Sequence, residues 1–329
     1  MVLTPHVRDA KPVRHVLLVE DHRSYAEAMR RALVASGWSV RLAGTATTGM
    51  SLARQPGLHA AVVDYRLPGE SGLALVRSLR HGGMTVPAVL TTAFPSEEVA
   101  QACNREGICY ISKIALQPAE IAASLGEHVG RFESRRRMAS RILVVIDQIA
   151  HACHESVRID AWPHLIRPLA RLLGEPDVPV VALAAAADVI KCCMESTVDV
   201  RDVVEFVPWR SAKLKRDCAR VPEFDVDRIA EAVDSSDSGW PSASSVLRSV
   251  FGLSSTEVQM QSRRYFGWSW RVFCRYGTAR RVTPLLLHTS EHIAQIAYHL
   301  GYKTPQSFDR DFRRVFGISP RGFRSLSRS

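Results

Sequence analysis

The sequence predicts a multidomain protein: a doubly wound, five-stranded parallel α/β domain, a mostly α-helical central region and an all-α tandem helix-turn-helix domain. A length of 329 residues exceeds what one ordinary core holds, which indicates two or three domains. Short apolar runs alternate with helical patterns over residues 14–128, whereas only helical patterns follow residue 224. The excess positive charge is also confined to one end of the chain, which indicates that the two ends differ in function.

Five short apolar runs predict the strands of the first domain. Helical patterns separate them, and strands that alternate with helices form parallel sheets covered on both faces. Such sheets gather their ligands at the carboxyl ends of the strands. The predicted strands contain residues 16–19, 40–42, 60–63, 88–90 and 108–111, and the predicted helices contain residues 24–36, 47–54, 71–81, 96–105 and those from 118.

Polar side chains follow four of these runs, where the sheet is expected to bind its ligand. They are Glu20 and Asp21 after the first run, Asp64 after the third, Thr92 after the fourth and Lys113 after the fifth. Carboxylate oxygens suit Mg²⁺, so the three acids predict a magnesium site. With the metal offsetting its charge, a phosphoryl group can be attacked by the Asp64 carboxylate and paired with Lys113. The sequence therefore predicts a phosphoacceptor site centred on Asp64.

Two further residues at this edge predict a switch. The Thr92 hydroxyl can turn toward a phosphoryl oxygen, and that movement opens space into which Tyr110 can turn. A side chain pair with two such arrangements is an element that a phosphate can bias. We therefore expect Thr92, Tyr110 and Lys113 to form the switch and phosphate contacts.

Residues 14–128 resemble a response-regulator receiver domain, and four segments carry the resemblance. They are Val19-Glu20-Asp21, the segment from Val62 to Gly72, Thr92-Ala93 and the segment from Tyr110 to Lys113. The resemblance implies Mg²⁺ dependence, phosphotransfer from a cognate sensor histidine kinase and slow self-dephosphorylation, without the role of a dedicated enzyme. The chain departs from the family at Ile114, because the family lysine is usually followed by proline.

An aspartate-nucleophile phosphatase is the competing enzyme hypothesis for the same residues. Those enzymes use a second aspartate two residues after the nucleophile as the acid and base. Arg66 stands at that position here. The sequence therefore favours a phosphoacceptor over a phosphatase.

The central region, residues 129–223, is predicted to be helical, and its role stays open. Ile142, Ile146 and Ile149 recur at helical spacing on one face. Such a face either packs within its own domain or pairs with a second copy, giving a homodimer. Binding of an effector to this region is a third hypothesis.

The last 89 residues carry the entire charge excess. Residues 1–130 have a net charge of +2 and residues 131–240 of −2, whereas residues 241–329 carry 14 basic and 4 acidic side chains. A compact segment with that balance suits a polyanion such as DNA. A basic surface that only aids solubility is the alternative.

A helix-turn-helix pattern lies within this basic segment. A helix that ends near Gly301 is followed by a second one, which Thr304 can cap and Pro305 can begin. The second helix has a buried aromatic face and a polar, basic outer face. We expect Lys303, Gln306 and Arg310 near base edges and Arg313 and Arg314 on the DNA backbone. The full predicted contact set of this helix is Lys303, Gln306, Ser307, Arg310, Arg313 and Arg314.

Residues 224–327 resemble an AraC/XylS-type DNA-binding domain. The matching segments are Ile293–Ala297, Gly301-Tyr302, Phe308–Phe312, Phe316–Pro320 and Phe323-Arg324. The resemblance implies binding to double-stranded DNA at promoter sites through two helix-turn-helix units joined by a long helix over residues 270–287. The first unit would present a recognition helix over residues 255–266, with Gln259, Ser262, Arg263 and Arg264.

The joining helix departs from the family pattern. Thr278 and Val282 replace the usual arginine and alanine, and Pro284 sits late in the helix. Since proline lacks a backbone N–H, Pro284 is expected to kink or shorten this helix.

Together these observations predict a two-component response regulator, a sequence-specific transcription factor controlled by phosphorylation of Asp64. The alternative is a receiver-type protein-interaction module whose DNA-binding domain works independently of phosphorylation or follows an effector bound to the centre. No apolar run is long enough to span a bilayer and no secretory signal is visible, so we expect a cytoplasmic protein without membrane partners.

Overall fold

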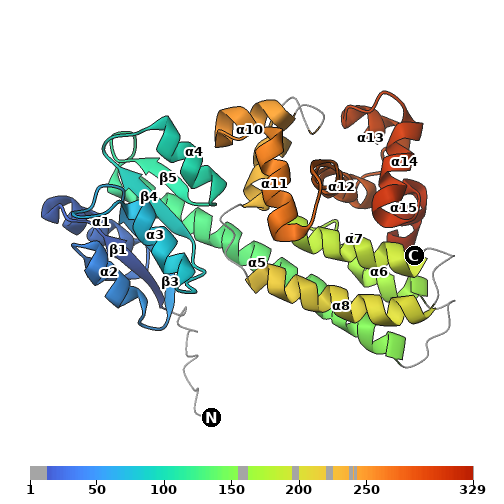
Figure 1. Ribbon diagram of the computed structural model, residues 1–329, viewed down its shortest axis with the longest axis horizontal. Helices are drawn as coiled ribbons and strands as arrows, with labels where there is room; N and C mark the ends of the chain where they lie inside the picture. Colours follow the sequence, from blue (N-terminus) through green and yellow to red (C-terminus); the bar gives the residue numbers. More distant parts are fainter. Residues whose placement is uncertain are drawn as a thin grey trace, which may run out of the picture. The chain divides into compact units, whose positions relative to one another are not determined.

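The computed structural model describes residues 13–154, 162–194, 200–219, 225–236, 240 and 243–328 (Figure 1). Contacts divide the chain into two compact units. The first contains Met1–Cys103 and Gly107–Gly130, and the second contains Asn104–Glu106 and Arg131–Ser329. The predicted division at residues 128 and 223 stays a prediction, and the start of the last domain at residue 224 lies outside the described residues.

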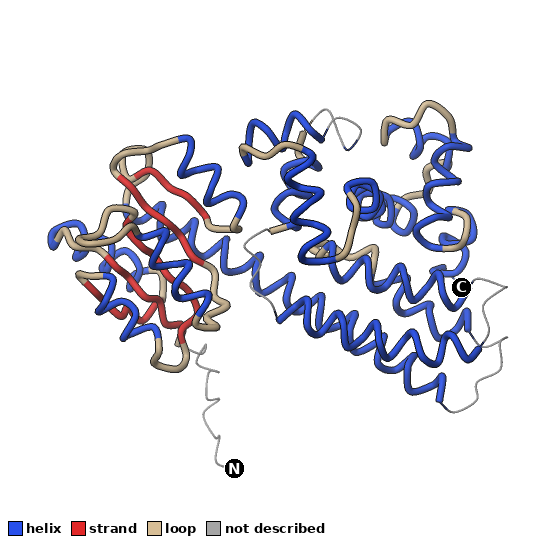
Figure 2. Tube along the Cα trace, viewed as in Figure 1, coloured by secondary structure: helices blue, strands red, loops and turns tan. Residues whose placement is uncertain are grey.

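The first unit is built on a five-stranded parallel sheet in the order β2-β1-β3-β4-β5, which confirms the predicted α/β fold. Figure 2 shows the described strands within this unit. The strands are β1 (Arg14–Val19), β2 (Trp38–Ala43), β3 (Leu58–Asp64), β4 (Ala88–Thr92) and β5 (Cys109–Ser112). The helices are α1 (Arg23–Ala35), α2 (Ala46–Ala53), α3 (Gly72–His81), α4 (Glu97–Arg105) and the start of α5 (Pro118–His154).

Both faces of the sheet are covered because successive strand residues point to opposite sides. Leu17 and Val19 of β1 pack into a core shared with α2, α3 and α4. Val16 and Leu18 pack into a second core with α1 and α5. All four side chains are at most 1% exposed, which explains why β1 is a continuous apolar run.

The second unit is helical throughout its described residues, which confirms the predicted helical centre and all-α C-terminal region. After the second half of α5 come α6 (Trp162–Leu172), α7 (Val180–Met194), α8 (Val200–Ala219), α9 (Val226–Asp234), α10 (Ala243–Phe251), α11 (Ser255–Phe266), α12 (Trp270–His288), α13 (Ile293–His299), α14 (Pro305–Phe316) and α15 (Pro320–Arg328). Within the described part of the chain, no helix is both long and apolar enough to cross a membrane.

The buried helix α7 joins the central region to the C-terminal helices. Every residue from Val180 to Ala187 is buried, and α7 packs against α6 and α8 on one side and against α12 and α14 on the other. The Thr283 hydroxyl of α12 donates to the Leu173 carbonyl at 2.6 Å. The central region, which was predicted as separate from the helix-turn-helix domain, therefore shares one apolar core with it.

The apolar face of α5 packs inside its own unit. Ile142, Ile146 and Ile149 are at most 1% exposed and belong to the core of the second unit. Of the two hypotheses for this face, packing within the unit is therefore the correct one. A homodimer formed through these three isoleucines is wrong, because the side chains are already covered.

The second helix-turn-helix begins as its sequence predicts. Gly301 adopts a φ of +81°, a backbone conformation that side-chain-bearing residues rarely take. The Thr304 hydroxyl accepts from the Ser307 backbone N–H at 3.2 Å, and Pro305 is the first residue of α14. Both parts of the predicted start of α14 are confirmed.

Pro284 does not shorten the joining helix. The helix α12 continues past it to His288, and Leu286 beyond the proline is fully buried. Of the two expected effects, shortening is wrong, because packing of the following turn keeps the chain helical, and a kink at Pro284 stays a prediction. The observed helix covers the predicted residues 270–287.

We expect Gly277→Ala to destabilise the second unit. Alanine normally stabilises a helix relative to glycine by about 0.5–1 kcal/mol. In α12, however, a Cβ at Gly277 would collide with the indole of Trp240, which is buried and donates to Asp234 at 2.9 Å. Overpacking of this kind costs about 1–3 kcal/mol, so the clash should outweigh the helix propensity.

Urea denaturation followed by circular dichroism checks this ordering, with Gly130→Ala in α5 as the control. A Cβ at Gly130 meets no atom within 4 Å, so this variant should gain about 0.5–1 kcal/mol. A Gly277→Ala protein as stable as Gly130→Ala would contradict the packing of Trp240 on α12.

Candidate functional site

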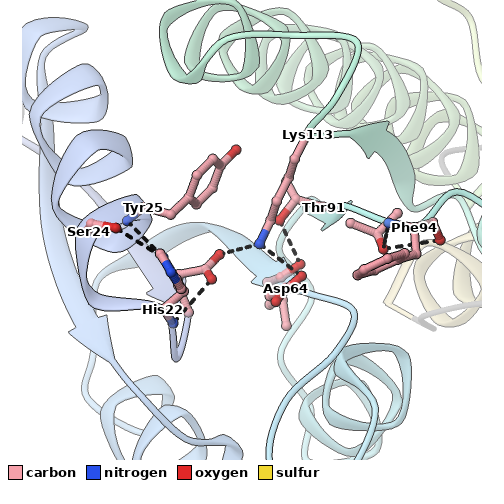
Figure 3. A network of polar contacts seen from close by, with 10 residues as sticks. His22, Ser24, Tyr25, Asp64, Thr91, Phe94 and Lys113 are labelled. Atoms are coloured by element: carbon pink, nitrogen blue, oxygen red, sulfur yellow. Dashed lines mark hydrogen bonds and ion pairs between the residues drawn. The ribbon is translucent and has the colours of Figure 1, made fainter.

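The carboxyl edge of the sheet brings three charged side chains together. Glu20 follows β1, Asp64 ends β3 and Lys113 follows β5. The Lys113 ammonium lies 2.6 Å from a Glu20 oxygen and 3.0 Å from an Asp64 oxygen (Figure 3). Glu20 is 3% and Asp64 is 7% exposed, so these ion pairs are largely removed from water. Residues far apart in sequence meet here because parallel strands end at one edge.

The same edge carries a cluster of three acids. Glu20, Asp21 and Asp64 each offer a carboxylate oxygen, and these oxygens lie within 4.8 Å of one another. Asp21 is exposed, whereas the other two acids are buried. Such an arrangement of hard oxygen ligands, open on one side, fits a divalent cation that retains several waters.

Lys113 controls the electrostatics of this cluster. Burial raises the pKa of the Glu20 carboxyl, and the neighbouring Lys113 ammonium opposes that rise. The ammonium also lies 4.5 Å from the centre of the Tyr25 ring, a cation–π distance. Lys113 thus offsets charge that two buried carboxylates could not hold together alone.

Tyr25 is a member of the site that sequence reasoning missed. Burial, followed by the charges of Glu20 and Asp64, raises the pKa of its phenol to about 12. Its hydroxyl is buried and makes no hydrogen bond to the part of the chain that the structure describes. No sequence pattern distinguishes it from an ordinary aromatic residue on α1, because its place under Lys113 depends on the packing of two distant elements.

Thr92 and Tyr110 lie beside the cluster. The Thr92 side chain is fully buried, and its hydroxyl accepts from the Phe94 backbone N–H at 3.1 Å. The Tyr110 hydroxyl accepts from the Ser96 backbone N–H at 3.0 Å, at the start of α4. These bonds hold one arrangement of each side chain, and the exchange between two arrangements stays a prediction.

The position two residues after Asp64 carries no acid. Arg66 stands there, with its guanidinium 4.0 Å from the centre of the Phe94 ring. The phosphatase hypothesis requires a carboxylate at this position, so the presence of an arginine counts against it.

The outer face of α14 presents most of the side chains predicted to contact DNA. Lys303, Gln306, Arg310, Arg313 and Arg314 are exposed, opposite a buried aromatic face. Arg313 pairs with Asp309 at 2.7 Å and Arg314 pairs with Asp311 at 3.0 Å. Ser307 is half-buried and bonds to the backbone carbonyl of Thr304. Contact of all six with DNA stays a prediction.

On α11 the structure corrects one predicted contact. Arg263 and Arg264 are exposed and Gln259 is half-buried, but Ser262 is 0% exposed. Ser262 stands one turn from both Val258 and Phe266, the other buried residues of this helix. Ser262 is therefore wrong as a DNA contact, because it faces the core.

The spacing of the buried residues of α11 also points to a surface residue that sequence reasoning missed. Met260 is 60% exposed on this helix, away from Val258. The helical spacing of the apolar residues could have shown both that Ser262 is buried and that Met260 is exposed.

Comparison with known proteins assigns the two ends of the chain. Residues 16–125 match the response regulator receiver domain family, and residues 247–325 match a helix-turn-helix domain family. These two matches indicate a receiver domain at one end of the chain and a helix-turn-helix domain at the other. In particular, its N-terminal part is a response regulator receiver domain, and its C-terminal part is a helix-turn-helix domain of the AraC type.

Curated relatives match part of the chain. The uncharacterized transcriptional regulatory protein YkoG of Bacillus subtilis is 35% identical over 79 residues, which are 24% of this chain and 35% of that protein. The response regulator MprA of Mycobacterium sp. (strain KMS) is 37% identical over 82 residues, 25% of this chain and 35% of MprA. The chain thus spans about a third of the length of each of these relatives.

A solved structure also matches part of the chain. A CheY-like receiver domain protein from Methanospirillum hungatei JF-1 is 21% identical, with a TM-score of 0.35 over 37% of this chain and 98% of that chain.

We expect Lys113→Met to lower the free energy of unfolding by about 2–4 kcal/mol at pH 7 without divalent cations, because two buried carboxylates lose their cation. Loss of the ammonium should raise the pKa of Glu20 further above its ordinary range. A carboxyl with a raised folded-state pKa costs stability above its unfolded pKa, and this cost disappears as the pH falls toward that value. The deficit of the variant should therefore shrink between pH 7 and pH 5.

Urea denaturation at both pH values measures this deficit, with Lys303→Met as a control that removes an exposed lysine. The control should change the free energy of unfolding by less than about 0.5 kcal/mol at either pH. A Lys113→Met deficit of equal size at pH 5 and pH 7 would contradict the proposed electrostatic role.

Proposed function

We propose that this protein is a two-component response regulator, a sequence-specific transcription factor whose activity follows phosphorylation of Asp64. The observation that carries the proposal is the Lys113 ammonium, 3.0 Å from Asp64 within an acidic cluster at the sheet edge. The receiver and helix-turn-helix domains at the two ends supply the signal input and the DNA-binding output.

The residues of the acidic cluster divide the phosphoryl transfer between them. Glu20, Asp21 and Asp64 would hold Mg²⁺, which offsets the charge of the incoming phosphoryl group. The Asp64 carboxylate attacks phosphorus, a P–O bond forms, and the P–N bond to a histidine of the sensor kinase breaks. The Lys113 ammonium would then pair with a phosphoryl oxygen in place of a carboxylate. The Thr92 hydroxyl would give up its hydrogen bond with Phe94 and donate to a second phosphoryl oxygen.

The output is proposed to be binding to double-stranded DNA at promoter sites. The exposed faces of α11 and α14 would enter the major groove, with Gln306 and Arg310 reading bases and Arg313 contacting phosphate. We propose a cytoplasmic location, which a promoter-binding protein would require. The domains are those of a DNA-binding regulator, a class that typically lacks the role of a dedicated enzyme.

Control by an effector bound to the central region has less support. The buried helix α7 fills the middle of that region, and its residues from Ala184 to Ala187 are 0% exposed. Small side chains there let neighbouring helices approach closely, which favours a packing role.

Phosphorylation of Asp64 is tested with a small phosphodonor and Mg²⁺. We expect stoichiometric label on the wild-type protein and on Glu98→Gln, which removes an exposed carboxylate of α4 outside the cluster. Asp64→Ala should carry no label, and Asp21→Asn should be labelled at least tenfold more slowly, because metal binding weakens. Equal label on wild type and Asp64→Ala, measured by mass spectrometry of the intact proteins, would reject Asp64 as phosphoacceptor.

DNA readout is tested by selecting bound sequences from a random pool, with phosphorylated and unphosphorylated protein. We expect Gln306→Ala and Arg310→Ala to relax the preference at individual base pairs by about 1–3 kcal/mol. Arg313→Ala should instead weaken binding to all sequences about equally. Ser262→Ala is the control, because its buried side chain cannot reach a base, and a changed base preference in that variant would contradict the placement of α11.

A further inference from the structure

A basic groove of about 380 Å³ lies between the joining helix α12 and the second helix-turn-helix. We call it the α12–α14 groove and define it by its charged residues. Arg271 and Arg275 contribute to it from α12, and Arg310, Asp311 and Arg314 contribute from α14. The groove is therefore lined by four arginines and one aspartate.

The α12–α14 groove carries excess positive charge, because one aspartate stands against four arginines in its lining. Arg314 pairs with Asp311, the aspartate of the groove, at 3.0 Å. Arg271, Arg275 and Arg310 form no ion pair with any residue that the structure describes. Arg271 and Arg275 are also one helical turn apart, where like charges repel. An anion bound in the groove would relieve this repulsion.

The position of the groove suits the backbone of DNA. Both α11 and α14 pack on α12, which lies between them in Figure 1. When two recognition helices enter successive major grooves on one face of DNA, the minor groove between them faces the helix that joins them. Two sugar-phosphate strands border that minor groove, so phosphates would be the part of the DNA nearest to α12.

The α12–α14 groove also opens onto the recognition surface. Arg310 lines the groove and is an exposed residue on the outer face of α14, opposite Phe308 and Phe312. Arg275 lies near Tyr302 on the opposite wall, where its charge opposes the burial that raises the pKa of Tyr302 to about 12. A strand of DNA that contacts Arg310 therefore has direct access to the arginines of α12.

We propose that the α12–α14 groove binds the phosphodiester backbone between the two half-sites, through Arg271 and Arg275. The inference rests on the proposed DNA-binding function and adds contacts that neither recognition helix supplies. The planar guanidinium group can donate two parallel hydrogen bonds to one phosphate, which suits arginine to this role. The joining helix then contributes affinity independent of base sequence and sets the spacing between the half-sites.

The salt dependence of DNA binding by the full-length protein tests the groove. The probe is a duplex, selected from a random pool, that contains both half-sites. Each lost phosphate contact lowers the slope of log affinity against log salt by about 0.9. We therefore expect Arg271→Gln with Arg275→Gln to lower the slope by about 1.8 and to weaken binding at moderate salt at least tenfold. The lysine double variant, Arg271→Lys with Arg275→Lys, should keep most of the slope, because it retains the charge.

A matched control and a modified duplex locate the effect. Arg216→Gln removes an exposed arginine of α8 in the same unit and should leave the slope unchanged. Uncharged methylphosphonates in the central minor groove should weaken binding by the wild-type protein. They should have little further effect on the Arg271→Gln, Arg275→Gln protein, since the same contact is already lost.

The outcomes separate this inference from the proposed function. A wild-type protein that binds no selected duplex would overturn both. A wild-type protein that binds DNA, with an unchanged slope in the glutamine double variant, would overturn the groove assignment alone. Thermal stabilisation by inorganic phosphate in the wild type but not in the double variant, with the DNA slope unchanged, would make the groove a site for free anions and reject the DNA assignment.

Discussion

The Lys113 ammonium between Glu20 and Asp64 is the interaction on which the receiver site depends. A nucleophilic carboxylate and its metal ligands must stand together, and such a group is unstable when buried unless a cation neutralises it. The parallel sheet provides that arrangement, because β1, β3 and β5 all end at one edge. The same ammonium is the group that a bound phosphate would recruit, so one side chain serves both stability and the proposed signal.

The second unit depends on the buried helix α7. Its alanine-rich middle lets α6 and α8 approach from one side and α12 and α14 from the other. The Leu173 carbonyl, which follows α6 in the central region, accepts from Thr283, so the helix that joins the two helix-turn-helix motifs is anchored to the centre. The central region is therefore part of the scaffold of the DNA-binding helices, and the α12–α14 groove is held open between two elements that rest on that scaffold.

Sequence reasoning predicted the polar residues that follow strands better than the polar residues that lie on helices. Glu20, Asp64 and Lys113 were predicted together because each follows a recognisable strand. Ser262 was predicted as a DNA contact from its place on the recognition helix that the resemblance implies, although its spacing from Val258 and Phe266 places it in the core. Arg271 and Arg275 of α12 were not predicted as DNA contacts, because a joining helix has no local signature of what lies opposite it.

The sequence by itself determined the α/β fold of the first unit, the acidic edge of its sheet and the helical start at Thr304. These features follow from short-range periodicity, capping and the rule that parallel strands end together. Only the tertiary structure decided that Tyr25 lies under Lys113, that the α5 isoleucines are covered, and that the arginines of α12 and α14 share a groove. Such features depend on which helices pack together, and that is set by the summed burial of residues far apart in the chain.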